Sequence, residues 1–458
     1  MPARRVKKAN GACRPHHRAN GQTSGTLTNM GQRSFVALTS LVALIAVGAA
    51  VHAAPPYDSE QPFTPASPVD EKVLALLRKQ GIAPASRCSD AVFVRRVYLD
   101  VIGTLPRPTE VESFLKDQRP DKRALLIDAL LARDEFGQYW GLKWGDLLRI
   151  KSEFPINLWP NAVQAYDRWV RNAIAANMPY DQFVRELLTA SGSNFRVPQV
   201  NFYRAVQNRE PVGLASAVAL TFMGTRLEKW PETMRNQMGT FFSRVAYKKT
   251  GEWKEEIVYP DPMKTDPLPV VFPDGSKLTI PAGKDPRVVF ADWLLAPNNQ
   301  WFSRAIVNRV WYWFMGRGII HEPDDIRSTN PPVNPELLSY LQGELVKSRY
   351  DLKALYRLIL NSATYQQSSV PTSKQPQTEA LFAVYPVRRL DAEVLIDALC
   401  WLAGDGQGYS SQVPEPFTWI PEAKRAITLM DGSITSAFLE LFGRPPRDTG
   451  QESERNNQ

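Results

Sequence analysis

The sequence of 458 residues contains little cysteine and little histidine, with three cysteines and four histidines. Because Cys13, His16, His17 and His52 all lie in the first 54 residues, His321 is the only histidine that follows them. The remainder of one chain therefore cannot form a site with two histidine ligands, a four-thiolate zinc site or a four-cysteine iron–sulfur cluster. A Ser-His-Asp triad there would have to use His321.

The chain also has almost no charge excess outside its first segment. The formal net charge is +8, but residues 1–54 hold seven Lys and Arg and no Asp or Glu. Removing these seven from 55 leaves 48 basic against 47 acidic residues, a net charge of +1. The charge balance therefore gives no argument for nucleic-acid binding. Hydrophobic residues at 43% and a length of 458 indicate a globular protein of more than one domain.

The first segment has the pattern of a leader. The apolar run "FVALTSLVALIAVGAAVHA", residues 35–53, follows Arg33 and ends in small residues. This predicts a signal peptide cleaved near Ala53, and hence a periplasmic or secreted protein with no stable membrane span after cleavage. The alternatives are that the run stays as a membrane anchor, and that Met30 is the true start. No cysteine follows the run to accept a lipid.

The remaining chain is mainly helical in pattern. A Pro-rich linker at 55–68 precedes a first helical domain at 69–252, and the apolar spacing resumes in a second helical domain at 284–458. Between them, residues 253–283 alternate apolar and polar around Pro273-Asp274-Gly275, which predicts a small β-hairpin insertion. We expect the fold class to be mainly α. The polar ending "DTGQESERNNQ" is expected to be frayed.

One stretch, "GRGIIHEPDDIRSTNPPVNPELL" at 316–338, gathers a histidine, carboxylates and arginines. It could be an acid/base site or an oxygen-rich Ca or Mg site, but we favour an ion-paired clasp between two helices. In the clasp, the glycines end one helix and Asn334, followed by Pro335, begins the next. The candidate functional or clasp residues are Arg317, His321, Asp324, Asp325, Arg327, Asn330 and Asn334.

Three other groups of residues have both a structural and a functional interpretation. Cys88 and Cys400 could form a disulfide in an oxidising compartment, although two buried thiols are the favoured interpretation. The spacing of Arg96 and Asp100 predicts a surface ion pair on one helix. The aromatic run at 311–313 could stack on sugar, but core packing is favoured for Trp311, Tyr312 and Trp313.

Several stretches together resemble one family. These are "FVRRVYLDVIGTLPRPTEVESFL", "NRVWYWFMGRGIIHEPDDIRSTNPPVNPELLSYL", "SRYDLKALYRLILNSATYQQSS", "RRLDAEVLIDAL" and "FLELFGRPPR". They resemble the planctomycete-type, cytochrome-associated proteins, which pair domains of unknown function called PSCyt-two and PSD-one. The resemblance covers most of residues 70–455 and implies an exported protein. Many members of the family carry a further haem domain, and the family supplies no established activity.

The departures from the family pattern bear on cofactors. Where relatives typically read "LGVRxxCAQCHxHPFDxW", this chain reads "MGTRLEKW" at 223–230, so the Cys-x-x-Cys-His segment is missing. Where relatives carry a "CECER"-like stretch, this chain has "GQESER" at 450–455. The family usually continues further, so we expect a second domain that is truncated or divergent. The resemblance implies no fixed histidine at His321, whereas the family pattern is matched at Asp324, Asp325, Arg327, Asn330, Pro331, Pro332 and Asn334.

These observations favour a cofactor-free scaffold or partner-binding subunit with a protein partner in the envelope, no bound metal and no nucleic acid. Two alternatives stay open. One is an enzyme acting on envelope or polysaccharide material, with Asp324 and Asp325 as acids and Trp311 or Trp313 stacking on sugar. The other is a redox accessory that docks a separate haem protein. Oligomeric state has no signal in the sequence.

Overall fold

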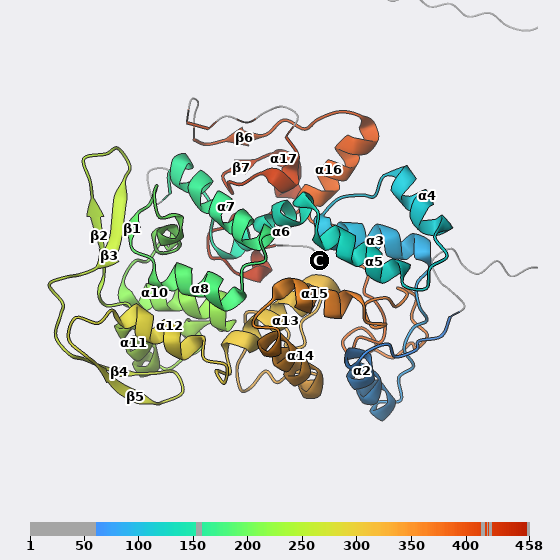
Figure 1. Cartoon of the computed structure of the whole chain (residues 1–458), viewed down its shortest axis with the longest axis horizontal. Coiled ribbons are helices and arrows are strands. Elements are labelled where there is room, and N and C mark those ends of the chain that lie inside the picture. Colours follow the sequence, from blue (N-terminus) through green and yellow to red (C-terminus); the bar gives the residue numbers. More distant parts are fainter. Residues whose placement is uncertain (1–60, 153–157, 414–416, 419, 421–423, 456–458) are drawn as a thin grey trace, which may run out of the picture. The chain divides into compact units, whose positions relative to one another are not determined.

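The computed structural model describes residues 61–152, 158–413, 417–418, 420 and 424–455 (Figure 1). The apolar run, its cleavage site near Ala53 and residues 55–60 of the linker lie outside the described residues. All the helices and strands described below belong to the unit Ala54–Gln458. No helix among the described residues is long and apolar enough to cross a membrane.

Helices dominate the regular structure, which confirms the predicted fold class. The helix α3 shows how the sequence sets their limits, because the Ser89 side chain accepts a hydrogen bond from the Val92 amide and Gly103 ends the helix at a φ of 59°. Ahead of the strands β2 and β3 the helices are α2 Pro68–Lys79, α3 Asp90–Ile102, α4 Pro108–Lys116, α5 Lys122–Leu131, α6 Asp134–Leu147, α7 Pro160–Ala175, α8 Tyr180–Thr189, α9 Asn201–Ala205, α10 Pro211–Val218 and α11 Glu232–Thr240. After the strand β5 they are α12 Pro286–Leu294, α13 Phe302–Met315, α14 Pro335–Lys347, α15 Leu352–Leu360, α16 Ala392–Ala403 and α17 Ala437–Leu441.

The described strands form small antiparallel sheets. The predicted hairpin around Gly275 is present as β4 (Leu268–Val271) and β5 (Lys277–Ile280), with Gly275 at a φ of 85°. A second hairpin pairs β2 (Val245–Lys249) with β3 (Glu256–Pro260), and β1 (Gly192–Ser193) adds to the free edge of β3. The strand β2 starts before the predicted range of 253–283. A last short pair joins β6 (Ser410–Ser411) to β7 (Ile434–Thr435).

Helices from both predicted helical domains share one hydrophobic core. The ring centroid of the buried Trp140 of α6 lies 5.2 Å from that of Trp313 and 5.5 Å from that of Phe314 of α13, and 4.6 Å from that of Tyr356 of α15. Such aromatic contacts bury large apolar surfaces and hold the two halves of the sequence together. A smaller cluster packs α16 against α17 and β7. The boundary between the two helical domains stays a prediction.

The polar ending does not behave as predicted. Instead of fraying, residues up to Arg455 pack against the fold, and Glu452 and Arg455 are 7% and 6% exposed. The cause is ion pairing, since Arg455 contacts Asp146 of α6 at 2.6 Å and Glu393 of α16 at 2.7 Å. Residues 452–455 thereby contact α6, α13 and α16, where the candidate site is found.

Candidate functional site

Asp324 of the 316–338 stretch is a buried anchor. Its Oδ1 accepts a hydrogen bond from Arg309 Nη2 at 2.7 Å, and its Oδ2 accepts one from the Glu452 amide at 2.5 Å. Arg309 is also buried and donates to the Thr221 carbonyl oxygen at 2.7 Å. Asp324 therefore ties α13 to the end of the chain, while Arg309 ties α13 to the π-helical turn Ala219–Met223.

The other charged residues of the stretch form pairs nearer to solvent. Asp325 contacts Lys229 at 2.8 Å and Arg327 at 3.1 Å, and Glu322 contacts Arg226 at 3.2 Å. Exposed pairs of this kind contribute little individually, roughly 0–1 kcal/mol. They lie beside the backbone hydrogen bond from the Ile326 amide to the Gly224 carbonyl oxygen.

Two asparagines fix the turn within the stretch. Asn330 donates through Nδ2 to the backbone oxygens of His321 and Asp325, at 2.9 and 3.0 Å. Asn334 accepts from the Leu337 amide at 3.0 Å, which confirms it as the N-cap of α14. Both side chains thus hydrogen-bond to the backbone and hold the segment between α13 and α14 in its conformation.

His321 forms no ion pair with Asp324 or Asp325 among the described residues. Its Nδ1 is buried and has no hydrogen-bond partner, and burial together with the nearby Arg317 lowers its pKa, against the opposing effect of Glu322. In the part of the chain that the structure describes, no three residues of the His, Cys, Asp or Glu types are grouped as metal ligands. The alternative of a metal site in this stretch therefore finds no group of three ligands among the described residues.

His321 and Arg317 instead open into a pocket of about 680 Å³, called the basic pocket below. A volume of this order suits a small molecule or a few side chains of a partner. Cations outnumber carboxylates on its walls, and aromatic rings and Pro386 complete it. The polar and aromatic lining residues are Lys143, Tyr312, Trp313, Arg317, His321, Glu379, Arg388, Arg389, Glu452 and Arg455.

Three wall cations are held by carboxylates behind them. Lys143 of α6 contacts Asp391 at 2.7 Å, and Arg388 contacts Asp100 at 2.6 Å. Arg455 is held by Asp146, as above, and by Glu393 of α16. Burial would raise the pKa of Glu393, but Arg455 and Arg444 lower it to about 2, so this carboxylate is charged at neutral pH.

Glu452 is the buried acid of the pocket. Its Oε1 accepts a hydrogen bond from Trp313 Nε1 at 2.8 Å, and its Oε2 lies 3.7 Å from Arg309 Nε. Burial and then the nearby Asp324 raise the pKa of Glu452 to about 7, against the opposing effects of Arg309 and Lys143. This carboxyl can therefore gain or lose a proton near neutral pH.

Arg317 differs from the other cations of the pocket. Among the described residues it has no ion-pair partner, and its Nε is buried without a hydrogen-bond partner. A buried polar group without a partner is costly, by roughly 1–3 kcal/mol and more when the group is charged. Arg317 is thus the pocket residue with most to gain from an added anion.

Comparison with protein families gives two matches. Residues 68–240 match PSCyt2, described as a protein of unknown function (DUF1549), and residues 286–458 match PSD1, described as a protein of unknown function (DUF1553). The chain belongs to the proteins that pair PSCyt2 with PSD1. Searches among curated proteins and among solved structures found no match.

The basic pocket draws on both family regions. Lys143 comes from the PSCyt2 region, whereas the other lining residues come from the PSD1 region. The strands β2–β5 lie in residues 241–285, which neither family model covers.

The stretch "MGTRLEKW" does not suit the haem or metal that the resemblance implies for relatives. It offers no thiol and no imidazole, and its cationic arms Arg226 and Lys229 are paired with Glu322 and Asp325. Ammonium and guanidinium groups repel a metal cation and supply no lone pair to it. Its remaining possible donors are the buried Met223 and the exposed Glu228, which do not replace the thiols and imidazole of the relatives.

Two cysteines and one predicted ion pair lie outside the basic pocket. Cys88 is buried and Cys400 is half-buried, and both are free thiols, so the possible disulfide between them is not formed. Arg96 does not pair with Asp100, because its guanidinium donates to the Tyr365 carbonyl oxygen at 2.7 Å. Asp100 forms an ion pair with Arg388 of the basic pocket instead.

The aromatic run divides between core and pocket. Trp311 is fully buried, whereas Tyr312 and Trp313 reach the pocket wall, although Trp313 is only 6% exposed. Sequence reasoning did not single out Lys143, Arg388, Glu452 or Arg455. The only available signal was that "GQESER" stands where relatives carry a distinctive stretch.

Proposed function

We propose that this protein is an exported partner-binding subunit of an envelope assembly, and that the basic pocket holds an acidic group of its protein partner. The observation that carries the binding proposal is Arg317, a cation without an ion-pair partner among the described residues, at a pocket with a cationic lining. The leader pattern before Ala53 supports export.

The charge arrangement behind the pocket supports an anionic ligand. Asp391, Asp100 and Glu393 neutralise Lys143, Arg388 and Arg455, whereas Arg317 has no ion-pair partner among the described residues. An incoming carboxylate would complete the hydrogen bonding of Arg317, and charge-assisted bonds to arginine are about twice as strong as neutral ones. An uncharged ligand would leave the guanidinium without its counter-ion.

The polysaccharide enzyme with Asp324 and Asp325 as its acids receives less support. Asp324 is 1% exposed and bound to Arg309, and Asp325 is engaged by Lys229 and Arg327. Neither carboxylate lines the basic pocket. The redox accessory that docks a haem protein stays a prediction.

A second candidate function is acid–base catalysis by Glu452. The observation that favours it is the carboxyl pKa of about 7 in a pocket, which suits a group that exchanges protons at neutral pH. In that case Glu452→Gln would abolish turnover of a substrate but leave its binding intact. If the protein only binds its partner, no turnover is detected in either the wild type or Glu452→Gln.

The proposal is tested by calorimetric titration at low salt, with the protein purified from an exporting host. We expect hexaglutamate to bind and hexalysine not to bind. Losing one charge-assisted bond costs roughly 1.5–3 kcal/mol, so Arg317→Gln should weaken hexaglutamate binding by about tenfold or more. The matched control is Arg95→Gln, because Arg95 is exposed on α3 and has no ion pair among the described residues.

Either of two results would contradict the proposal. The first is that hexaglutamate does not bind, or that hexalysine binds as well. The second is that Arg95→Gln weakens binding as much as Arg317→Gln does, which would indicate attraction by the general field of the protein. Fractionation of cells that express the full chain tests export separately, with recovery in the cytoplasm as the contrary result.

A further inference from the structure

Three aromatic side chains from separate parts of the chain meet at the surface. Trp159 precedes α7, Trp253 lies in the turn between β2 and β3, and Phe417 lies between α16 and β7. Their ring centroids are 4.9 Å apart for Trp159 and Trp253, 5.1 Å for Trp159 and Phe417, and 5.4 Å for Trp253 and Phe417. These three residues are called the aromatic platform below.

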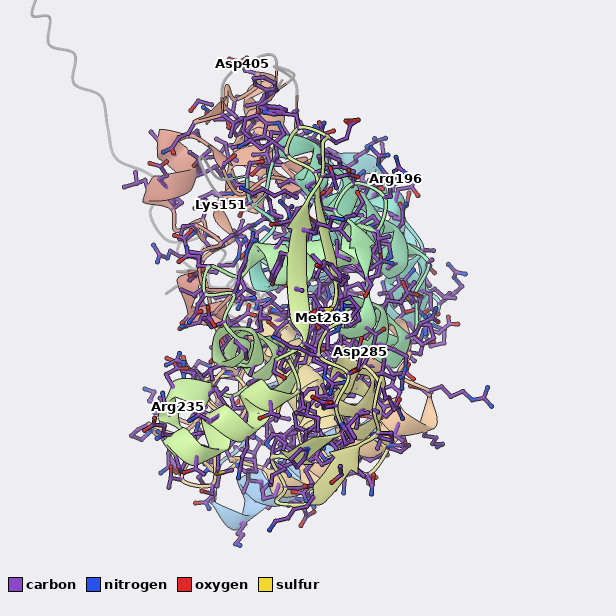
Figure 2. All side chains as sticks on the ribbon, turned by 90° about the vertical axis from the view of Figure 1, so that its left-hand side faces the viewer. Lys151, Arg196, Arg235, Met263, Asp285 and Asp405 are labelled. Carbon is purple, nitrogen blue, oxygen red and sulfur yellow. The ribbon has the colours of Figure 1, made fainter. Side chains whose placement is uncertain are left out.

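The platform is exposed to an extent that core packing does not explain. Trp159 is nearly buried, but Trp253 is 60% and Phe417 is 41% exposed. Adjacent exposed apolar side chains often mark a binding surface. The β2–β3 hairpin that carries Trp253 lies on the left-hand side of Figure 1, the side that faces the viewer in Figure 2.

A polar pocket of about 720 Å³ adjoins the platform, and Trp159 and Trp253 form part of its wall. The charged groups of the wall are of both signs, with Arg204, Arg209, Lys249 and Lys254 against Glu252, Glu255 and Glu256. Glu256 contacts Arg204 at 2.9 Å and Arg209 at 3.1 Å, so two of these cations are already neutralised. Gln207 adds an exposed amide, which can donate and accept.

Aromatic rings beside a wall that carries both signs of charge argue against several classes of ligand. A nucleotide or another phosphate ligand would favour arginines free to bind it, whereas both arginines of this wall are paired with Glu256 and its four cations face three carboxylates. A quaternary ammonium would require a gap between the rings, but the centroids are at most 5.4 Å apart and the Lys254 ammonium already lies 5.0 Å from the Trp159 ring. A wholly apolar ligand would leave the charged wall without solvent or partners.

An uncharged sugar satisfies both parts of the surface. The apolar C–H face of a pyranose can pack against an exposed ring such as Trp253, and its hydroxyl groups both donate and accept hydrogen bonds. Carboxylates and guanidinium groups on one wall can serve those hydroxyls without favouring either charge. We propose that the aromatic platform and the adjoining polar pocket bind an uncharged oligosaccharide.

The test is calorimetric titration with three neutral hexasaccharides, namely cellohexaose, maltohexaose and chitohexaose, and with hexagalacturonate as the acidic comparison. We expect at least one neutral hexasaccharide to bind and to change the tryptophan fluorescence. Trp253→Ala should weaken that binding by tenfold or more, and Trp253→Phe should retain most of it. The matched control is Trp401→Ala, because Trp401 on α16 is 51% exposed and lies outside this pocket.

The proposal is overturned if none of the three neutral hexasaccharides binds, or if only hexagalacturonate binds. It is also overturned if Trp401→Ala reduces the binding as much as Trp253→Ala does. Because Trp253 is largely exposed, its variants are expected to unfold at the temperature of the wild type, which is checked before titration. The outcome is independent of hexaglutamate binding, which involves different residues.

Discussion

The basic pocket and the polar pocket beside the aromatic platform have nearly the same volume, about 680 and 720 Å³, but differ in the state of their charges. In the first, Arg317 has no ion-pair partner among the described residues, and Glu452 titrates near neutral pH. In the second, Glu256 neutralises Arg204 and Arg209, and exposed rings stand at the edge. The ligands that we propose for the two pockets therefore differ because of the charges on their walls, and not because of the space available.

The two sites also differ in what holds them. The walls of the basic pocket rest on buried ion pairs, whereas the aromatic platform stands on a hairpin turn and loops. Removing one partner of a buried pair leaves the other charged and buried, which is far more costly than losing an exposed contact. Variants that remove a buried ion pair should therefore lower the free energy of unfolding more than variants of the exposed aromatic platform.

The largest expected effect is a loss of folding stability when a buried ion pair behind the basic pocket is removed. Glu393→Gln removes the charge that holds Arg444 and Arg455, and it should lower the free energy of unfolding by roughly 3–5 kcal/mol. Urea denaturation measures this. The control is Glu112→Gln, whose exposed pair with Lys116 is expected to contribute no more than about 0.5 kcal/mol. Equal losses in the two variants would mean that the buried pairs do not support the pocket.

The next effect is a pH dependence of stability that comes from Glu452. Its pKa is about 7 in the folded protein, against 4.5 as the ordinary value, so its contribution is fully present below pH 4.5 and is lost as the pH rises through 7. The loss should approach roughly 3 kcal/mol. Urea denaturation from pH 5 to pH 8 measures it, and Glu452→Gln should show a much flatter profile. An unchanged profile in that variant would place the titrating group elsewhere.

A smaller effect is expected on anion binding. Above pH 7 the ionised Glu452 adds a negative charge to the basic pocket, so hexaglutamate should bind several-fold more weakly at pH 8 than at pH 6.5. His321 is expected to contribute little over this range because its pKa is lowered. Titration at the two pH values measures the change. If hexaglutamate binding weakened between pH 6.5 and pH 8 as much in Glu452→Gln as in the wild type, Glu452 would not be the group responsible.

The smallest effect is that of Trp253→Ala on folding. Because Trp253 is 60% exposed, its loss should change the free energy of unfolding by no more than about 0.5 kcal/mol. Thermal and urea denaturation measure it. A loss of several kcal/mol would show that the aromatic platform supports the fold, and would weaken its interpretation as a binding surface.

The sequence was most informative where structure is local. The cap at Ser89, the cap at Asn334 and the helix end at Gly316 each depend on neighbouring residues, and each could be predicted. The helix α4 has no side-chain cap at Arg107, where the backbone amide donates to Glu110 Oε2 at 2.7 Å. Local patterns fix the presence of a helix better than its first residue.

The basic pocket could not be predicted in the same way. Lys143 and Glu452 are more than 300 residues apart in the sequence, and no periodic pattern links them. The polar ending resembles a solvated tail, because polarity alone does not show that Asp146, Glu393 and Asp391 supply buried partners for Arg455. Trp253 gave no signal either, since a single tryptophan near a turn has many structural explanations.

The most direct test of the account is a crossed titration. Hexaglutamate and the neutral hexasaccharide that binds best are each titrated into the wild type, Arg317→Gln and Trp253→Ala. The account predicts that Arg317→Gln loses affinity for hexaglutamate alone, by about tenfold or more, and that Trp253→Ala loses affinity for the sugar alone. If either variant weakened both ligands equally, the two pockets would not select by their unpaired charges, and the central claim would be contradicted.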